Sequence, residues 1–304
     1  MEVLMRNMFQ SLGKSRSANK LAKKYGLRFG ASRFVAGETI QQSIEAVRKL
    51  NREGRVVTLD HLGEFISTES EAEDSMDMCL MTLDAIAEAG VQSNLSLKMT
   101  SLGLDISKEL CFSHMRQILD RARQYGNFVR IDMEDYSHCQ VSLDIYRELR
   151  REYDNVGIVI QAYLYRTEED IRDLNELKAN LRLVKGAYKE SPKVAFPEKS
   201  DVDENYKKII RAHLMNGNYT AVASHDPKII EYTKDLVKEQ GIALSQFEFQ
   251  MLYGICEELQ QQLVREGYKV RVYVPYGIDW FGYFMRRLAE RPANVWFVLK
   301  NMFK

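Results

Sequence analysis

The sequence feature that most constrains the fold is a repeated alternation of short apolar runs with longer helix-like stretches. Eight runs of five or six residues, rich in apolar or β-branched side chains, are separated by polar turns and by stretches long enough for one helix each. These runs are residues 56–60, 94–99, 128–133, 157–162, 181–185, 220–224, 247–252 and 270–274. Strands that alternate with helices form parallel βαβ units, because parallel neighbours need a crossover connection. Eight such units predict closure into a (β/α)₈ barrel, with an open doubly wound sheet as the alternative.

Two of the intervening stretches carry clear helix signals. Residues 69–89 have apolar side chains at helical spacing and end at Gly90, and residues 227–240 follow Asp226 and end at Gly241. Residues 1–53 precede the first strand and are typical of an N-terminal helical arm, most strongly at residues 41–52. We therefore expect a helical arm over residues 1–53 and a barrel domain over residues 54–304.

Composition excludes several classes of protein. Lys plus Arg and Asp plus Glu number 43 each, so no overall positive field exists to attract nucleic acid. The four cysteines show no CxxC pair and no zinc-ligand spacing to histidine, which predicts reduced thiols and no metal site. No run approaches the roughly 18 apolar residues of a membrane span, and the first 20 residues lack the apolar segment of a signal peptide. We expect a cytoplasmic protein, with peripheral membrane contact through a basic helix left open.

Polar residues close most of the predicted strands, where a barrel builds its active site. They are Asp60, Glu64, Lys98, Asp132, Glu134, Gln161, Arg182, Lys185, Ser224, His225, Asp226 and Tyr273. A charge inside a short apolar run is costly to bury unless it is paired or used on a ligand. Lys98, Asp132, Arg182 and Lys185 therefore indicate either an internal salt-bridge network or a binding site. His225 by itself is more typical of a structural histidine.

The last helical stretch, residues 280–291, has two distinct faces. Its apolar stripe consists of Phe281, Phe284, Met285 and Leu288, and the opposite face carries Tyr283, Arg286, Arg287 and Glu290. Adjacent guanidinium groups suit a carboxylate or a phosphate, because each offers a fixed fork of donors. Taken alone, however, a polar helix face of this kind is more often exposed to solvent than part of a binding site.

Four motifs, in order along the chain, resemble the proline dehydrogenase family in its short monofunctional bacterial form. They are residues 129–135 (VRIDMED), 181–188 (LRLVKGAY), 247–254 (FEFQMLYG) and 286–294 (RRLAERPAN), and the likeness extends from about residue 55 to residue 294. The resemblance implies a distorted TIM-type barrel whose last helix lies over the barrel mouth. The arginine face would then lie above a substrate instead of in solvent.

The resemblance also implies roles for individual residues. Arg286, Arg287 and Lys98 would bind the carboxylate of L-proline, and the ring pocket would be shaped by Ala187, Tyr188, Leu252 and Tyr273. Asp132, Arg182 and Tyr273 match active-site positions, with Arg182 beside the flavin N5. Positions in or around the FAD site are matched by Met133, Gln161, Arg182, Lys185, Gly186, Ala187, Ser224, His225 and Glu290. A tyrosine at position 273 is associated in the family with preference for proline over hydroxyproline.

The implied activity is FAD-dependent oxidation of L-proline to Δ1-pyrroline-5-carboxylate, with electrons passed to a membrane quinone. No GxGxxG fingerprint follows a strand, so FAD is implied by the resemblance alone. Two other readings stay open from the residues themselves. One is a barrel aldolase or lyase with Lys98 or Lys185 as a Schiff-base amine, and the other is a barrel that only binds an anionic metabolite through Arg286 and Arg287. Flavin colour that bleaches with proline would distinguish a proline dehydrogenase from both of these alternatives.

Overall fold

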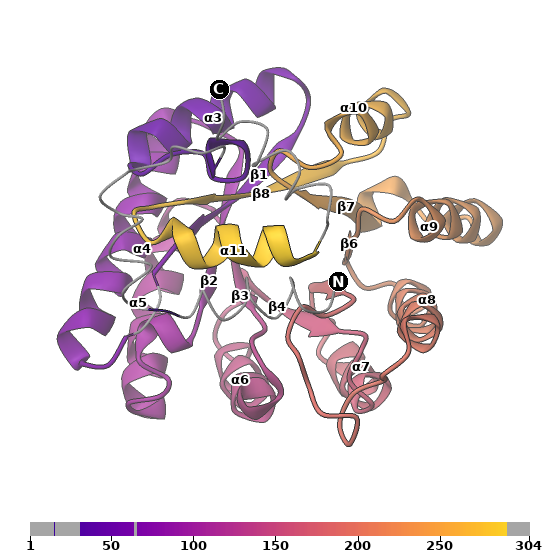
Figure 1. Ribbon diagram of the computed structural model, residues 1–304, viewed down its shortest axis with the longest axis horizontal. Coiled ribbons are helices and arrows are strands. Elements are labelled where there is room, and N and C mark those ends of the chain that lie inside the picture. Colours follow the sequence, from indigo (N-terminus) through magenta and orange to yellow (C-terminus); the bar gives the residue numbers. More distant parts are fainter. Residues whose placement is uncertain (1–14, 16–30, 64–65, 291–304) are drawn as a thin grey trace.

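A computed structural model describes residues 15, 31–63 and 66–290, and eight parallel strands close into a barrel in it (Figure 1). Each strand pairs with its neighbours in sequence order, and β1 pairs with β8 to complete the circle. The strands are β1 Val56–His61, β2 Ser93–Lys98, β3 Val129–Asp132, β4 Val156–Gln161, β5 Leu181–Val184, β6 Thr220–Ala223, β7 Phe247–Leu252 and β8 Val270–Tyr276. The predicted (β/α)₈ barrel is confirmed, and the open sheet is excluded.

The strand β7 has the predicted bounds, and the carboxyl ends of the other strands differ from the predicted ends by one or two residues. The strand β8 extends to Tyr276, because β1 continues to pair with it as far as His61 opposite Tyr276. The strands β3, β5 and β6 end one residue early, so Met133, Lys185 and Ser224 follow their strands instead of closing them.

The helices that cover the barrel begin and end where local chemistry dictates. The helices α4 Glu69–Ala89 and α9 Pro227–Gln240 have the predicted bounds. Thr68 and Glu71 form a capping box at the start of α4, and Gly90 ends it in the left-handed region at φ 60°. The other helices are α3 Ile40–Arg52, α5 Lys108–Gln124, α6 Tyr136–Leu149, α7 Thr167–Glu176, α8 Lys199–Met215, α10 Glu257–Arg265 and α11 Trp280–Glu290, with short 3₁₀ turns η1 Ala31–Arg33, η2 Thr100–Leu102 and η3 Leu244–Gln246. No helix in this described part is long and apolar enough to cross a membrane.

The interior of the barrel contains charged side chains. Arg182 on β5 bonds to Asp132 on β3 and to Gln250 on β7, although neither strand is a neighbour of β5. Side chains from non-neighbouring strands of a closed barrel can meet only in its lumen. Near the amino ends of the strands, Arg271 Nε and Glu248 Oε1 form a buried ion pair at 2.7 Å. Such pairing offsets part of the desolvation cost of the two charges.

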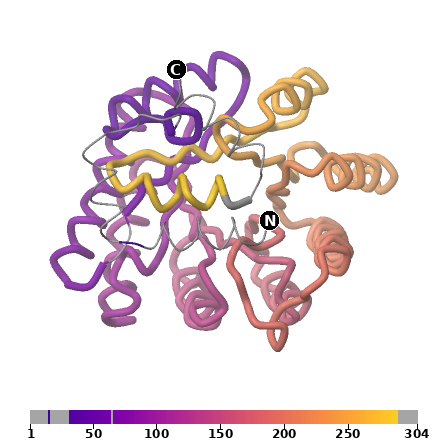
Figure 2. The backbone as a smooth tube through the Cα atoms, viewed as in Figure 1, coloured from indigo at the N-terminus to yellow at the C-terminus, as the bar shows by residue number. Residues whose placement is uncertain are grey.

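The helix α11 crosses the mouth of the barrel (Figures 1 and 2). A small apolar cluster fixes it there: Phe34 packs on Phe284 with ring centroids 6.1 Å apart, and Trp280 Nε1 donates to Glu38 at 3.2 Å. The helix α3 packs against β1 and β8 through Val47 and Leu50. Residues 31–52 therefore contact the barrel directly, whereas residues 1–14 and 16–30 of the predicted arm lie outside the described residues. The division at residue 53 stays a prediction.

Candidate active site

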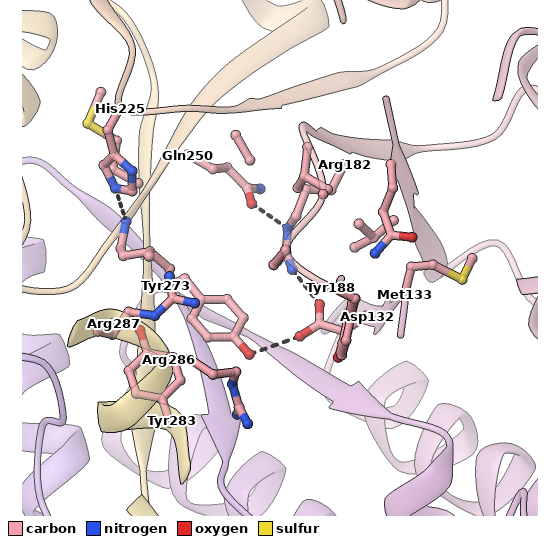
Figure 3. Close-up of a pocket in the computed structure, with 18 of the residues that line it drawn as sticks. Asp132, Met133, Arg182, Tyr188, His225, Gln250, Tyr273, Tyr283, Arg286 and Arg287 are labelled. Atoms are coloured by element: carbon pink, nitrogen blue, oxygen red, sulfur yellow. Dashed lines mark hydrogen bonds and ion pairs between the residues drawn. The ribbon is translucent and has the colours of Figure 1, made fainter. Parts of the chain in front are cut away.

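A cavity of about 1050 Å³, open solvent included, lies at the carboxyl ends of the strands beneath α11 (Figure 3). Most of the predicted site residues line it, namely Lys98, Asp132, Met133, Gln161, Arg182, Gly186, Ala187, Tyr188, His225, Leu252, Tyr273, Arg286 and Arg287. The closed barrel thus brings together residues that are far apart in sequence.

Two predicted site residues with described side chains, Lys185 and Ser224, are not among those that line the cavity. Lys185 Nζ instead lies 2.5 Å from Asp203 and 2.8 Å from Asp226, in an ion-pair cluster beside the mouth. Ser224 Oγ accepts a hydrogen bond from the backbone N–H of Asp226 at 3.1 Å. Glu290 belongs to α11, but its side chain is outside the described residues, as are Glu64 and residues 291–294 of the last motif.

Asp132 and Arg182 form the central ion pair of the cavity. Arg182 Nη1 lies 2.5 Å from Asp132 Oδ1, and the Ser96 hydroxyl donates to the same oxygen at 2.8 Å. The Arg182 side chain is only 6% exposed, so its positive charge is stabilised by these protein partners and not by water. Three strands therefore fix one carboxylate and one guanidinium at the floor of the cavity.

Tyr273 connects two carboxylates. Its hydroxyl hydrogen-bonds Asp60 Oδ2 and lies 2.9 Å from Asp132 Oδ2. Burial and both nearby carboxylates raise the pKa of Tyr273 far above its ordinary value of 10.0, so the phenol stays protonated. A phenol has one proton to donate, so the two carboxylates share a single donor.

Lys98 forms ion pairs with the same two carboxylates, Asp60 and Asp132. Its ammonium lies 2.9 Å from Asp60 and 3.9 Å from Asp132. Burial would lower the pKa of Lys98, but the carboxylates of Asp60 and Asp132 outweigh burial and leave that pKa above its ordinary value. A lysine that stays protonated is a poor nucleophile, which argues against a Schiff-base role for Lys98.

The helix α11 supplies the roof of the cavity. Both Arg286 and Arg287 line it, and Arg287 is only 9% exposed with its guanidinium carbon 5.0 Å from the centre of the Tyr283 ring. The solvated-face interpretation is therefore wrong for Arg287 and Tyr283, both of which are buried. The reason is that α11 crosses the barrel mouth, where Tyr283 and Arg287 line the cavity.

Several residues of this site were not assigned a role from the sequence. The sequence marks Asp60 only as a strand end and Tyr283 only as a member of the arginine face, and it does not single out Ser96 or Gln250. Ser96 and Gln250 occupy positions two residues before Lys98 and Leu252 on their strands, so period-2 alternation points them into the same lumen. The available signal was alternation, because Ser96 lies between Leu95 and Leu97 and Gln250 lies between Phe249 and Met251.

The family model described as "Proline dehydrogenase" matches residues 43–300 of this chain. The chain belongs to the proline dehydrogenase family. It is 55% identical to "Proline dehydrogenase 1" of Bacillus subtilis (strain 168), over 99% of this chain and 100% of the relative. It is 45% identical to "Proline dehydrogenase" of Deinococcus radiodurans over 90% of each chain. The resemblance inferred from the motifs is confirmed, and it extends further toward the amino terminus than residue 55.

A solved structure supports the same placement. Proline utilization A (PutA) from Bdellovibrio bacteriovorus, inactivated by N-propargylglycine, superposes with a TM-score of 0.81 and 29% sequence identity. The match covers 86% of this chain and 32% of that one, so this chain spans about a third of that PutA. Family membership makes the chain an oxidoreductase of proline metabolism, which disfavours the aldolase and the binding-only interpretations.

Proposed function

We propose that the chain binds FAD and oxidises L-proline to Δ1-pyrroline-5-carboxylate, with a hydride passed to flavin N5 and electrons then passed to a quinone. The observation that carries this proposal is the charge of the cavity. Its lining includes the cations Lys98, Arg182, Arg286 and Arg287 but, among the described residues, only the carboxylate Asp132. Even with Asp60 paired to Lys98, positive charge is in excess, which suits a substrate that carries a carboxylate.

Unpaired polar atoms in the cavity fit the flavin that the family resemblance implies. Gln161 Oε1 and Arg182 Nη2 are buried and have no hydrogen-bond partner among the described residues, although both side chains line the cavity. A buried donor or acceptor without a partner costs about 1–3 kcal/mol, so a ligand that pairs with both atoms is favoured. Apolar walls from Met133, Val159 and Val184 suit a planar ring system.

Gly186 and His225 also line the cavity. At Gly186 the backbone has φ of +116°, and a Cβ atom would collide with the Tyr163 ring, so only glycine is accommodated. His225 Nε2 accepts a hydrogen bond from the Leu252 backbone N–H at 2.9 Å, which places the proton of the neutral ring on Nδ1. We assign Met133, Gln161, Arg182, Gly186, Ala187 and His225 to the FAD site, with Lys185, Ser224 and Glu290 around it.

The substrate is bound by the residues of α11 and β8. Arg286 and Arg287 bind the carboxylate of proline, since each guanidinium can donate two parallel hydrogen bonds to its oxygens. Lys98 adds positive charge beneath them while Asp60 fixes its position. Leu252, Tyr273 and Ala187 contact the pyrrolidine ring, and Tyr188, which is 36% exposed, borders the opening.

The bound flavin supplies the hydride acceptor. Oxidation breaks the C–H bond of the ring carbon next to nitrogen and the N–H bond, and it forms a C=N double bond while a proton is released to water. Fixing the carboxylate at one end of the ring determines which carbon faces the acceptor. Arg182, Asp132 and Tyr273 form a rigid hydrogen-bonded floor, so little reorganisation is needed when charge moves.

The test of this proposal is the colour of the protein. Purified protein supplied with FAD should show flavin absorbance that bleaches on anaerobic addition of L-proline and returns when a quinone is added. Protein that never takes up FAD would rule out the proposal. Flavin that D-proline and L-proline bleach at equal rates would argue against a site that orients the carboxylate.

The electron acceptor requires contact with a membrane surface. We propose a cytoplasmic enzyme that meets the membrane peripherally, because a quinone is dissolved in the bilayer. Co-sedimentation with quinone-containing vesicles, with and without proline, tests this part separately. Fast turnover with a soluble quinone but none with vesicles would contradict it.

A further inference from the structure

The strongest unassigned feature is a chain of hydrogen bonds that runs up the barrel lumen to Arg182. It begins at Arg271, whose Nε lies 2.7 Å from Glu248 Oε1. Glu248 accepts from the Gln250 amide nitrogen at 2.5 Å, and the Gln250 amide oxygen accepts from Arg182 Nε at 2.5 Å. The four residues are between 2% and 7% exposed, so water cannot replace these bonds.

The direction of the Gln250 amide is fixed by its two partners. Burial would raise the pKa of Glu248, but Arg271 and Lys269 outweigh burial and lower the pKa to about 2. Glu248 is therefore an acceptor at every physiological pH, so the amide must turn its nitrogen toward Glu248. Its oxygen then necessarily faces Arg182.

The orientation of Arg182 follows from Gln250 and Asp132 together. Gln250 accepts from Nε, and Asp132 accepts from Nη1 at 2.5 Å, as the dashed lines in Figure 3 mark. A guanidinium group is planar, so fixing two of its nitrogens fixes the third. That third nitrogen, Nη2, is the buried atom that has no partner among the described residues of the cavity.

We propose that Gln250 is a positioning residue. Its bond to Glu248 fixes its own amide, and its bond to Arg182 then orients the guanidinium so that Arg182 Nη2 points toward the reacting groups. This inference rests on the proposed function, because the reacting groups are proline and the flavin. Gln250 acts through Arg182 and is not itself required to touch either one. Comparable cases show that misplacing a group near the reacting atoms by about 1 Å can slow a reaction by about 100-fold.

A purely structural role for Gln250 makes different predictions. Loss of a buried hydrogen bond would lower stability whichever end of the barrel it came from. Asn180 provides the matched case, because its amide oxygen accepts from the buried Arg130 Nη2 at 2.5 Å, just before β5 begins and so at the opposite end of the barrel. Asn180→Leu removes the same kind of bond without reaching the cavity.

The experiment compares wild type, Gln250→Met and Asn180→Leu, each loaded with FAD. We expect Gln250→Met to lower the limiting rate of flavin reduction by proline by about 10- to 100-fold, with little change in the apparent proline Kd. We also expect its flavin midpoint potential to become more negative, because a displaced Arg182 stabilises reduced flavin less. Asn180→Leu should lose stability but keep both the rate and the potential.

A second variant, Gln250→Glu, tests the same proposal if Gln250→Met does not fold. In Gln250→Glu, a protonated carboxyl group can donate to Glu248 and accept from Arg182 as the amide does. Once ionised, it faces Glu248 on its own strand, Arg182 from β5 and Arg271 from β8, and the bond to Glu248 is lost. The ratio of its rate to the wild-type rate should therefore fall as pH rises.

The outcomes separate this inference from the proposed function. A wild-type protein that proline cannot reduce overturns both. A reducible wild type with an unchanged rate and potential in Gln250→Met overturns the positioning role alone, as does an equal loss of rate in Asn180→Leu. A rate ratio for Gln250→Glu that does not vary with pH also contradicts it.

Discussion

Tyr273 donates toward Asp132 across the lumen of the barrel, at 2.9 Å, although their strands β8 and β3 are not neighbours. The phenol also bonds to Asp60 on β1, so it connects three strands at the floor of the cavity. Such a bond forms only when the barrel is closed. The geometry of the site is therefore tied directly to the geometry of the fold.

Replacing Tyr273 tests its proposed role in substrate choice. In Tyr273→Ser, the gap in kcat/KM between L-proline and trans-4-hydroxyproline should narrow, because removal of the ring makes room for the extra hydroxyl. Tyr273→Phe is the matched control, since it keeps the ring but loses the bonds to Asp60 and Asp132. A gap that stays the same in Tyr273→Ser would place specificity elsewhere.

Arg287→Met tests carboxylate binding by α11. A charged hydrogen bond contributes about 1.5–3 kcal/mol, so the proline KM should rise by roughly 10- to 100-fold while FAD remains bound. Arg265→Met is a suitable control, because Arg265 is exposed at the end of α10. A KM within error of wild type would refute the assigned role.

Asp60→Asn tests whether the cavity floor depends on paired charge. Lys98 would lose its partner at 2.9 Å and keep only Asp132 at 3.9 Å. Removing one member of a buried pair typically costs about 3–5 kcal/mol, and with Lys98 20% exposed we expect about 1–3 kcal/mol loss in the free energy of unfolding. Urea unfolding of Asp60→Asn and of the exposed Asp74→Asn would measure the difference. Equal free energies of unfolding in the two variants would show that the ion pair of Asp60 and Lys98 does not stabilise the fold.

His138 is expected to make stability depend on pH. Burial would lower the pKa of His138, but hydrogen bonds at 2.8 Å to Asp105 and 2.6 Å to Asp135 leave it above the ordinary 6.5. Protonated His138 therefore stabilises the folded state fully below about pH 6.5, and this contribution is lost as pH rises through the folded-state pKa. His138→Gln should lose less stability than wild type over that pH interval. Parallel curves of unfolding free energy against pH would contradict the assignment.

Much of the fold could be predicted because the patterns that define it are local. Alternation of apolar runs with helical stretches gave the barrel, and caps such as Gly90 and Gly241 gave the bounds of α4 and α9. The extension of β8 to Tyr276 was missed because it depends on pairing with β1, which lies more than 200 residues away. Strand ends that depend on a distant partner leave no local signal.

The site was predicted in part for a related reason. Charges at strand ends were visible in the sequence, and closure of the barrel brings Lys98, Asp132 and Arg182 together. The connections through Ser96 and Gln250 require knowing which strands face each other across the lumen. The burial of Arg287 also depends on α11 crossing the barrel mouth, which no periodicity in the helix reveals.

We propose above all that proline is oxidised in the cavity beneath α11, where Arg286 and Arg287 bind the proline carboxylate. The most direct test is anaerobic, rapid-mixing reduction of the FAD-loaded protein by L-proline and by L-prolinamide, whose carboxylate is replaced by a neutral amide. We predict saturable bleaching by L-proline, much weaker reduction by L-prolinamide, and a smaller difference between the two in Arg287→Met. Reduction by both compounds with equal efficiency, or no reduction by L-proline, would contradict the claim.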